Sequence, residues 1–289
     1  MSYKIVTDAS ADLTPRLVKD GGVCAIPMNY DLGDEQFVCD GLTSADTLKK
    51  YYDAVREGKM TRTSQIAPQQ YVDFFRPFCE RGENVLYLSL SSGLSSTYNS
   101  SLIAARELAE EFPNVTIRCV DSLAATVGMT LLLEKAVENR EAGMSIEENA
   151  AWLEENRLNV CHWFMVDDLM YLKRNGRISP AVAFVGAALG MKPLIRIEED
   201  GTLTNFEKKR GRQAALDRLV EHYKEGSEKP TGEHVFIPHT DAEESANYLE
   251  KAVKKLNPSA VVTKVLMGPV IGCHVGPGFC AIAHFGKRI

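Results

Sequence analysis

Residues 89–101 form a stretch rich in serine and threonine whose side chains could bind an anion. The apolar residues 85–88 before it predict a buried strand, and residues 103–111 after it are good helix formers. A helix start leaves backbone N–H groups without partners, and its dipole favours a negative charge. Hydroxyl groups at that place add further donors. The alternative is a helix start with surplus capping residues, because Ser and Thr are also common N-caps.

A second hydroxyl-rich segment comes before another predicted helix. Thr63 and Ser64 lie in residues 60–67, and Pro68 stands near the expected helix start. Arg177 follows a glycine and precedes a predicted helix start, so its side chain can point into a cleft between domains. These residues supply hydroxyl donors and a positive charge, which suits an anion.

His274 is the histidine whose neighbours best allow a ligand to come close. It lies between glycines in residues 270–285, which predict a glycine-rich turn running into a final strand. A histidine there can contact a ligand or simply bond a neighbouring carbonyl, and the sequence favours neither. His162 and His284 lie in strand-like runs and are expected to be structural. No H-E-x-x-H or H-x-H spacing occurs, so we expect no metal site.

Three familiar motifs of catalysis or nucleotide binding are missing or incomplete. Residues 93–97 begin like a nucleophile elbow but lack its closing glycine. Residues 276–281 match G-x-G-x-x-A, yet a strand rather than a helix is predicted after them. No phosphate-binding P-loop pattern occurs. The basic residues 208–212 are expected to be mostly solvated surface and are also a candidate partner surface.

Small polar turns recur between strands and helices in the first half of the chain. Predicted strands at residues 3–7, 85–90 and 115–120 are each followed by such a turn and a helix. This pattern predicts a parallel sheet covered by helices. Ligands bind beyond the carboxyl ends of such strands. The residues expected to share that edge are Asp8, Ser10, Ser92, Ser95, Asp121 and Ser122.

The second half of the chain follows a different pattern. Residues 193–197 and 203–206 predict a hairpin around an acidic turn, and further strands alternate with helices after it. The apolar residues 181–191 predict a buried core helix or, alternatively, the wall of an apolar tunnel. In the first half, residues 22–60 are expected to be an irregular excursion plus a helix.

Length and composition fit a two-domain globular protein. The chain has 289 residues, of which 45% are hydrophobic and 25% are charged. We expect an α/β domain with a mainly parallel sheet covered by helices in residues 1–160. A mixed-sheet α/β domain is expected in residues 161–289. The net charge of −6 and the isoelectric point near 5.6 argue against nucleic-acid binding.

Cysteine usage and the N-terminal sequence indicate the compartment. The 7 cysteines are scattered and form no C-x-x-C pair, which predicts neither a zinc site nor a disulfide framework. The N-terminus has no signal-peptide pattern, and no apolar run approaches the ~20 residues of a membrane helix. We therefore expect a cytoplasmic protein with mostly buried, reduced thiols.

Together these stretches resemble the DegV family of bacterial fatty-acid-binding proteins, which includes the FakB subunits of fatty-acid kinase. The resemblance runs through the whole chain. One departure is Ser96, where the family usually has glycine. The matching motifs stand in the family's order at residues 7–13, 63–65, 91–98, 120–122, 169–178, 191–193, 200–201 and 271–278.

The resemblance implies a two-domain α/β protein that holds a long-chain fatty acid, such as palmitate, between its domains. The hydroxyls of Thr63 and Ser95 would hold the carboxylate. The full set of residues implied around the head group is Thr63, Ser64, Ser92, Ser95, Arg177 and His274. The residues implied along the acyl chain are Phe184, Val185, Ala188 and Leu189.

The resemblance also implies a carrier that has no chemistry, cofactor or metal of its own. It would present the carboxylate to a partner kinase that forms the acyl phosphate, and it could contact a membrane transiently. An enzyme is the alternative hypothesis, a serine acyl transferase or hydrolase that uses Ser95 or Ser92 with His274. A DNA-binding or regulatory protein is a third hypothesis, which the acidic composition disfavours.

Overall fold

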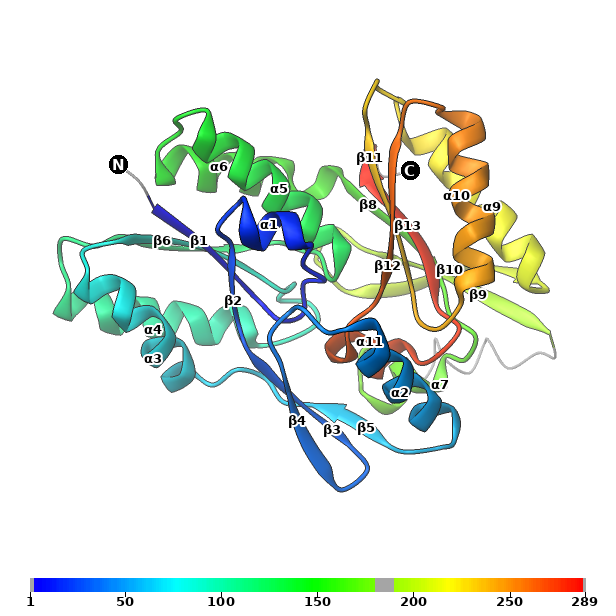
Figure 1. The fold of residues 1–289 in the computed structure, drawn as a ribbon, viewed down its shortest axis with the longest axis horizontal. Coiled ribbons are helices and arrows are strands. Elements are labelled where there is room, and N and C mark those ends of the chain that lie inside the picture. Colours follow the sequence, from blue (N-terminus) through cyan, green and yellow to red (C-terminus); the bar gives the residue numbers. More distant parts are fainter. Residues whose placement is uncertain (1–2, 180–189, 288–289) are drawn as a thin grey trace.

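Three β-sheets organise the computed structural model, which describes residues 3–179 and 190–287 (Figure 1). A four-stranded sheet belongs to the first half of the chain and a six-stranded sheet to the second half. A three-stranded sheet lies below them in the view of Figure 1. The predicted α/β fold, with one parallel and one mixed sheet, is therefore confirmed. The helix predicted over residues 181–189 falls outside the described residues.

The four-stranded sheet is entirely parallel, and helices cover both of its faces. Its two central strands are almost completely buried, as expected for a sheet that is covered on both faces. Its order is β2 (Cys24–Ile26), β1 (Tyr3–Asp8), β6 (Asn84–Ser89) and β7 (Ile117–Asp121). The helices of one face are α3 (Pro68–Glu80) and α4 (Thr97–Glu111), and those of the other are α1 (Pro15–Lys19), α5 (Val127–Glu141) and α6 (Ile146–Asn156).

The three-stranded antiparallel sheet was not predicted from the sequence. Its order is β4 (Glu35–Cys39), β3 (Met28–Leu32) and β5 (Thr61–Thr63). All of β4 except Cys39 is exposed, so this strand lacks the apolar alternation that identifies a strand. The expectation of an irregular excursion over residues 22–60 was therefore wrong. The helix expected within it is present as α2 (Ala45–Arg56).

The six-stranded sheet is mixed, and its last strand in the sequence lies near its centre. The predicted hairpin is confirmed as β9 and β10. Helices α9 (Arg212–Gly226) and α10 (Glu243–Leu256) cover one face, toward which Cys161 and Trp163 point. The alternate residue Phe164 points to the opposite face. The order is β10 (Leu203–Arg210), β9 (Met191–Ile197), β8 (Val160–Met165), β13 (Cys280–Phe285), β11 (His234–His239) and β12 (Val261–Leu266).

A short helix, α11 (Pro269–Val275), replaces the predicted glycine-rich turn before the last strand. The prediction of a turn was wrong because packing overrides the weak helix propensity of glycine. A Cβ on Gly272 would overlap the hydroxyl of Tyr52 on α2, so glycine allows the two helices to approach closely. Pro269 occupies the first helical position, where proline is favoured. The strand predicted after the G-x-G-x-x-A motif is confirmed as β13.

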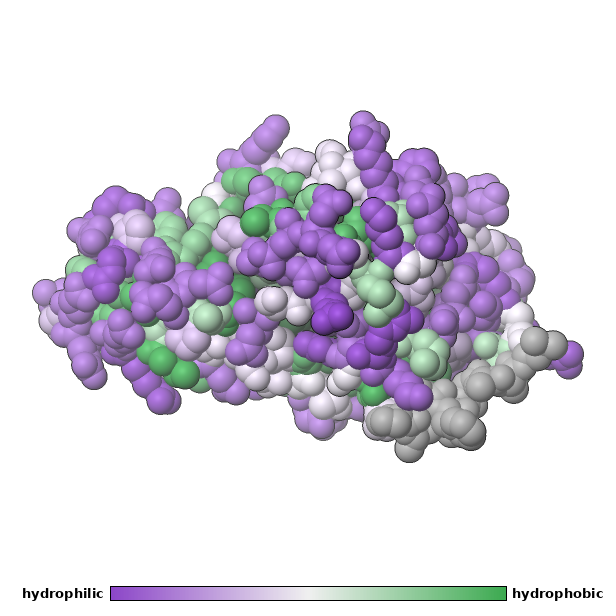
Figure 2. Space-filling view, turned by 90° about the horizontal axis from the view of Figure 1, so that it is seen from below, coloured by the Kyte–Doolittle hydropathy of each residue, from purple (hydrophilic) through white to green (hydrophobic). Residues whose placement is uncertain are grey.

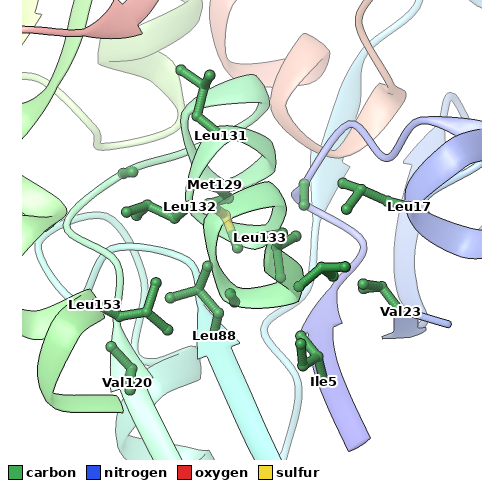
Figure 3. Close-up of a cluster of buried hydrophobic side chains, with 14 of the residues drawn as sticks. Ile5, Leu17, Val23, Leu88, Val120, Met129, Leu131, Leu132, Leu133 and Leu153 are labelled. Carbon is green, nitrogen blue, oxygen red and sulfur yellow. The ribbon is translucent and has the colours of Figure 1, made fainter. Parts of the chain in front are cut away.

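Helix α5 lies between the two large sheets and contacts strands of both (Figure 1). Its apolar residues surround it on nearly every side, as expected for a helix buried in a core. Figure 3 shows Met129, Leu132 and Leu133 on this helix, close to Leu88 on β6 and Ile5 on β1. Helix α5 therefore fixes the position of one half of the molecule relative to the other.

Hydrophilic residues predominate on the face that Figure 2 shows, and hydrophobic residues form small scattered patches there. Within the described residues, no helix is both long and apolar enough to span a bilayer. All cysteines are free thiols in the described chain, and most of them are buried, as predicted.

Candidate ligand-binding site

A cavity of about 840 Å³, part of it open to solvent, lies between the two halves of the chain. The end of β5, the serine loop (residues 90–96), α11 and one face of the six-stranded sheet contribute its walls. Most of the lining is apolar. Its polar residues include five of the six implied for the head group: Thr63, Ser64, Ser95, Arg177 and His274.

Thr63 and His274 form a hydrogen-bonded pair across 211 residues of sequence. Thr63 ends β5, His274 lies in the last turn of α11, and 2.9 Å separates Thr63 Oγ1 from His274 Nε2. If Nε2 donates to Thr63, the hydroxyl proton is free to bind an anion. If Thr63 donates to Nε2, the proton on Nδ1 is free instead. Each tautomer therefore leaves one donor.

His274 is held in its neutral form. Burial, and then the nearby positive charge of Arg177, lower the pKa of His274 from 6.5 to about 3. Its Nδ1 is buried and has no hydrogen-bond partner among the described residues. A neutral imidazole with so low a pKa is a weak general base, so its chemistry suits hydrogen bonding rather than proton abstraction.

The serine loop uses its own backbone N–H groups to hold its shape. The N–H of Leu90 donates to Asp8 (2.9 Å), and that of Ser92 donates to Asp121 (3.1 Å). The N–H of Ser91 donates to the carbonyl of Ala124 at 3.0 Å, and the N–H groups of residues 93–95 all donate to Ser91. The residues predicted to share this sheet edge do so. The N–H groups of residues 90–95 are therefore occupied, so within these residues the side-chain hydroxyls are the available donors.

Ser95 keeps its hydroxyl at the cavity through local bonds. Its Oγ accepts from the N–H of Thr97 at 3.3 Å and lies 2.7 Å from Thr97 Oγ1. Ser92, in contrast, is exposed, and it is not among the residues that line the cavity. The structure therefore brings Ser95 to the site but not Ser92. Among the described side chains, neither serine hydrogen-bonds His274, so no serine–histidine dyad is formed.

Arg177 reaches from the second half of the chain to the serine loop. It follows Gly176, which ends helix α7 (Met170–Arg174) with a left-handed φ of 70°. Its Nε donates to the carbonyl of Leu94 at 3.2 Å, and its Nη1 donates to the carbonyl of Asn175. Arg177 thus places a positive charge at the serine loop and near His274, as the resemblance implied.

The apolar part of the cavity lies over the face of the six-stranded sheet opposite α9 and α10. The acyl-lining residues predicted from the sequence, Phe184, Val185, Ala188 and Leu189, fall outside the described residues. Several lining residues were not predicted, among them Phe164, Phe279, Ala281 and Ala283. His162, which was expected to be purely structural, also lines the cavity. Strand alternation could have grouped these residues, but it could not show which face meets a ligand.

A protein-family model described as "Uncharacterised protein, DegV family" matches residues 2–287. The chain belongs to the DegV family. This DegV protein is 37% identical over 284 residues to a DegV domain-containing protein of Clostridium perfringens, and the match covers 98% of this chain and 97% of that protein.

Solved structures share the fold of this DegV protein over nearly all of its length. A DegV family protein from Thermus thermophilus, described as fatty-acid binding, has a TM-score of 0.86 at 28% identity and covers 99% of this chain and 100% of its own. The B3 protein of the Streptococcus pneumoniae fatty acid kinase, loaded with linoleic acid, has a TM-score of 0.85 at 20% identity and the same coverage. At 20% identity the likeness shows the fold alone.

Proposed function

We propose that this DegV protein binds a long-chain fatty acid, such as palmitate, and presents its carboxylate to a partner kinase. One observation carries the proposal: hydroxyls, an imidazole and a guanidinium gather at one end of a cavity whose lining is otherwise mostly apolar. A fatty acid has the same division into a charged head and an apolar tail. Fatty-acid binding by the Thermus relative, which is 28% identical to this chain, supports the proposal.

In this proposal the head group rests on the Thr63–His274 pair and on Ser95. These groups supply neutral donors. Arg177 supplies a positive charge that offsets the free-energy cost of removing a carboxylate from water. Ser64 lies beside Thr63 and lines the same cavity. Ser92 has no role, because it is exposed and its backbone N–H is bonded to Asp121.

The tail supplies most of the binding free energy. Each buried CH₂ contributes about 0.8 kcal/mol, so a chain of about fifteen carbons offers on the order of 12 kcal/mol before ordering costs. An apolar ligand of this size binds tightly even if its head group gains little. The head-group donors then fix which end of the ligand points outward.

Exposure at the head-group end supports presentation to a partner. Ser64 and Gln65 line the cavity and are exposed, so a carboxylate between them and Ser95 would lie close to solvent. A kinase could transfer a phosphoryl group to that carboxylate without the tail leaving its cavity. Such a partnership would place the protein in the cytoplasm with ATP, and loading would involve a transient membrane contact.

A serine acyl transferase or hydrolase is not favoured. Neither Ser92 nor Ser95 hydrogen-bonds His274, and the low pKa of His274 makes it a poor base. A fluorophosphonate probe should therefore leave all serines unlabelled. Covalent labelling of Ser95 would favour the enzyme instead.

The proposal has two experimental arms. Native mass spectrometry of the purified protein should show a mass increase that disappears on denaturation and matches an extracted fatty acid. Mixing the loaded protein with ATP and the fatty-acid kinase subunit of its own organism should give an acyl phosphate, trapped by hydroxylamine as the hydroxamate. A protein that neither retains nor takes up fatty acid would refute the binding role. Binding without hydroxamate would refute only the kinase partnership.

A further inference from the structure

Helix α5 meets strand β8 at a contact that the head-group site does not explain. Gly128, in the first turn of α5, lies directly against the imidazole of His162 on β8. A Cβ on Gly128 would overlap His162 Nε2, and its other near neighbours would also be atoms of that ring. Glycine at position 128 therefore allows the helix and the ring to occupy their places together.

Strand register shows where this contact lies along the cavity. Strand β8 leads toward α7 and Arg177, and β13 starts just after α11, which carries His274. The end of β8 and the start of β13 therefore mark the head-group end. Phe164 pairs with Ala281, and His162 pairs with Ala283. Because a strand advances about 3.3 Å per residue, the second pair lies roughly 7 Å farther from the head group.

Residues on the neighbouring strands extend the His162–Ala283 pair into a row across the sheet. Trp163 pairs with Arg196, so the next step of the register brings His162 opposite Ile197. Ile197 in turn pairs with Leu203. Leu203, Ile197, His162 and Ala283 all line the cavity. Of these four residues, His162 alone is polar, and it is backed by a helix that leaves no room for its ring to withdraw.

We propose that His162, held in place by Gly128, closes the far end of the acyl cavity and sets the chain length that the protein accepts. This inference rests on the proposed fatty-acid binding. A chain that reaches the ring cannot gain further apolar contact, because the next methylene meets an imidazole rather than open space. Each methylene that does fit improves affinity about fourfold. The affinity for fatty acids should therefore rise with chain length and then fall sharply.

The test measures dissociation constants for saturated fatty acids of increasing length, by displacement of a fluorescent fatty acid. His162→Ala removes the ring and should move the optimum to longer chains, with the affinity ratio of longer to original chain rising about fifteenfold for two added methylenes. Gly128→Ala should push the ring into the cavity and move the optimum to shorter chains. In the double variant the new methyl group occupies the vacated space, so the optimum should return toward that of His162→Ala.

Two controls separate the end-stop from general damage. Phe279→Leu changes a lining residue close to α11 and should weaken all chain lengths by a similar factor without moving the optimum. Circular dichroism verifies that each variant is folded. An unchanged optimum in folded His162→Ala would overturn the inference while leaving fatty-acid binding intact. Absence of binding by the unmodified protein would instead refute the proposed function.

Discussion

Gly93 of the serine loop and Gly201 of the β9–β10 turn meet backbone to backbone. A Cβ on Gly93 would lie 2.5 Å from the carbonyl carbon of Gly201. Beside this contact, Ser91 Oγ donates to the carbonyl oxygen of Gly201 at 2.9 Å. The loop that carries Ser95 is therefore pressed against a hairpin of the other sheet, and its position depends on both halves of the chain.

Gly93→Ala should lower stability, because a backbone segment rather than a flexible side chain would have to move. Overpacking of this kind typically costs about 1–3 kcal/mol. The measurement is the free energy of unfolding from urea titration. Ser92→Ala changes an exposed side chain in the same loop and serves as the control, with an expected change below about 0.5 kcal/mol. Equal stability of the two variants would contradict the close contact.

Thr63→Val keeps the shape of the side chain but removes the hydroxyl that bonds His274. A hydrogen bond to a charged group is worth about 1.5–3 kcal/mol, so fatty-acid affinity should fall by about ten- to a hundredfold. Ser95→Ala should act in the same direction. Isothermal titration with palmitate measures the loss, and Ser92→Ala should bind as the unmodified protein does. An effect of Ser92→Ala as large as that of Thr63→Val would show that the head group lies elsewhere.

His274 should make the protein less stable in acid. Its folded pKa of about 3 lies below its unfolded value of 6.5, so protons bind preferentially to the unfolded chain between these values. The stabilisation is fully present above pH 6.5 and is lost as pH falls toward 3, by up to about 1.4 kcal/mol per pH unit. His274→Gln removes this titration. Its unfolding free energy should therefore fall less steeply than that of the unmodified protein between pH 6.5 and 5.0, and parallel curves would contradict the burial of a neutral imidazole.

Asp12 should make the protein less stable as pH rises, which is opposite to the effect of His274. One of its carboxylate oxygens accepts from the N–H of Gly268 at 2.6 Å, just before α11, and the other is buried without a partner among the described residues. Burial raises the pKa of Asp12 from 3.8 to about 7. The contribution of Asp12 to the free energy of unfolding is fully present below pH 3.8, and it is lost as pH rises through 7. Asp12→Asn should therefore stabilise the protein at pH 8 by at most about 4 kcal/mol and much less at pH 5. A melting-temperature series over this range measures the difference, and a uniform effect at all pH values would refute it.

The sequence predicted those parts of the fold whose signal is local. Apolar strands followed by small polar turns predicted the parallel sheet, and hydroxyl-rich helix entries pointed to the two segments that line the cavity. The choice of Thr63 and Ser95 within those segments came from the resemblance to the DegV family. The exposed strand β4 gave no such signal, because its residues lack an apolar face. Helix α11 was missed because Gly272 there serves close packing against Tyr52 rather than a turn. Contacts between distant segments decide such features, and local propensity does not report them.

The cavity side of His162 could not be predicted for a related reason. Alternation along β8 separates His162 and Phe164 from Cys161 and Trp163, but both faces of the strand are buried. Only the placement of α9 and α10 decides which set meets helices and which set meets the cavity. A histidine in an apolar strand was therefore expected to be structural, because the sequence does not show which face of the strand α9 and α10 cover.

The position of β13 also determines the order in which the site can form during synthesis. This strand joins β8 to β11, yet it is made after both of them. Until residues 280–285 have left the ribosome, the six-stranded sheet remains two separate fragments, and Ala281 and Ala283 cannot form the base of the cavity. The cavity between the two halves of the chain therefore cannot be complete until this strand has emerged. A nascent chain stalled before it would leave the edges of β8 and β11 that face β13 without hydrogen-bond partners.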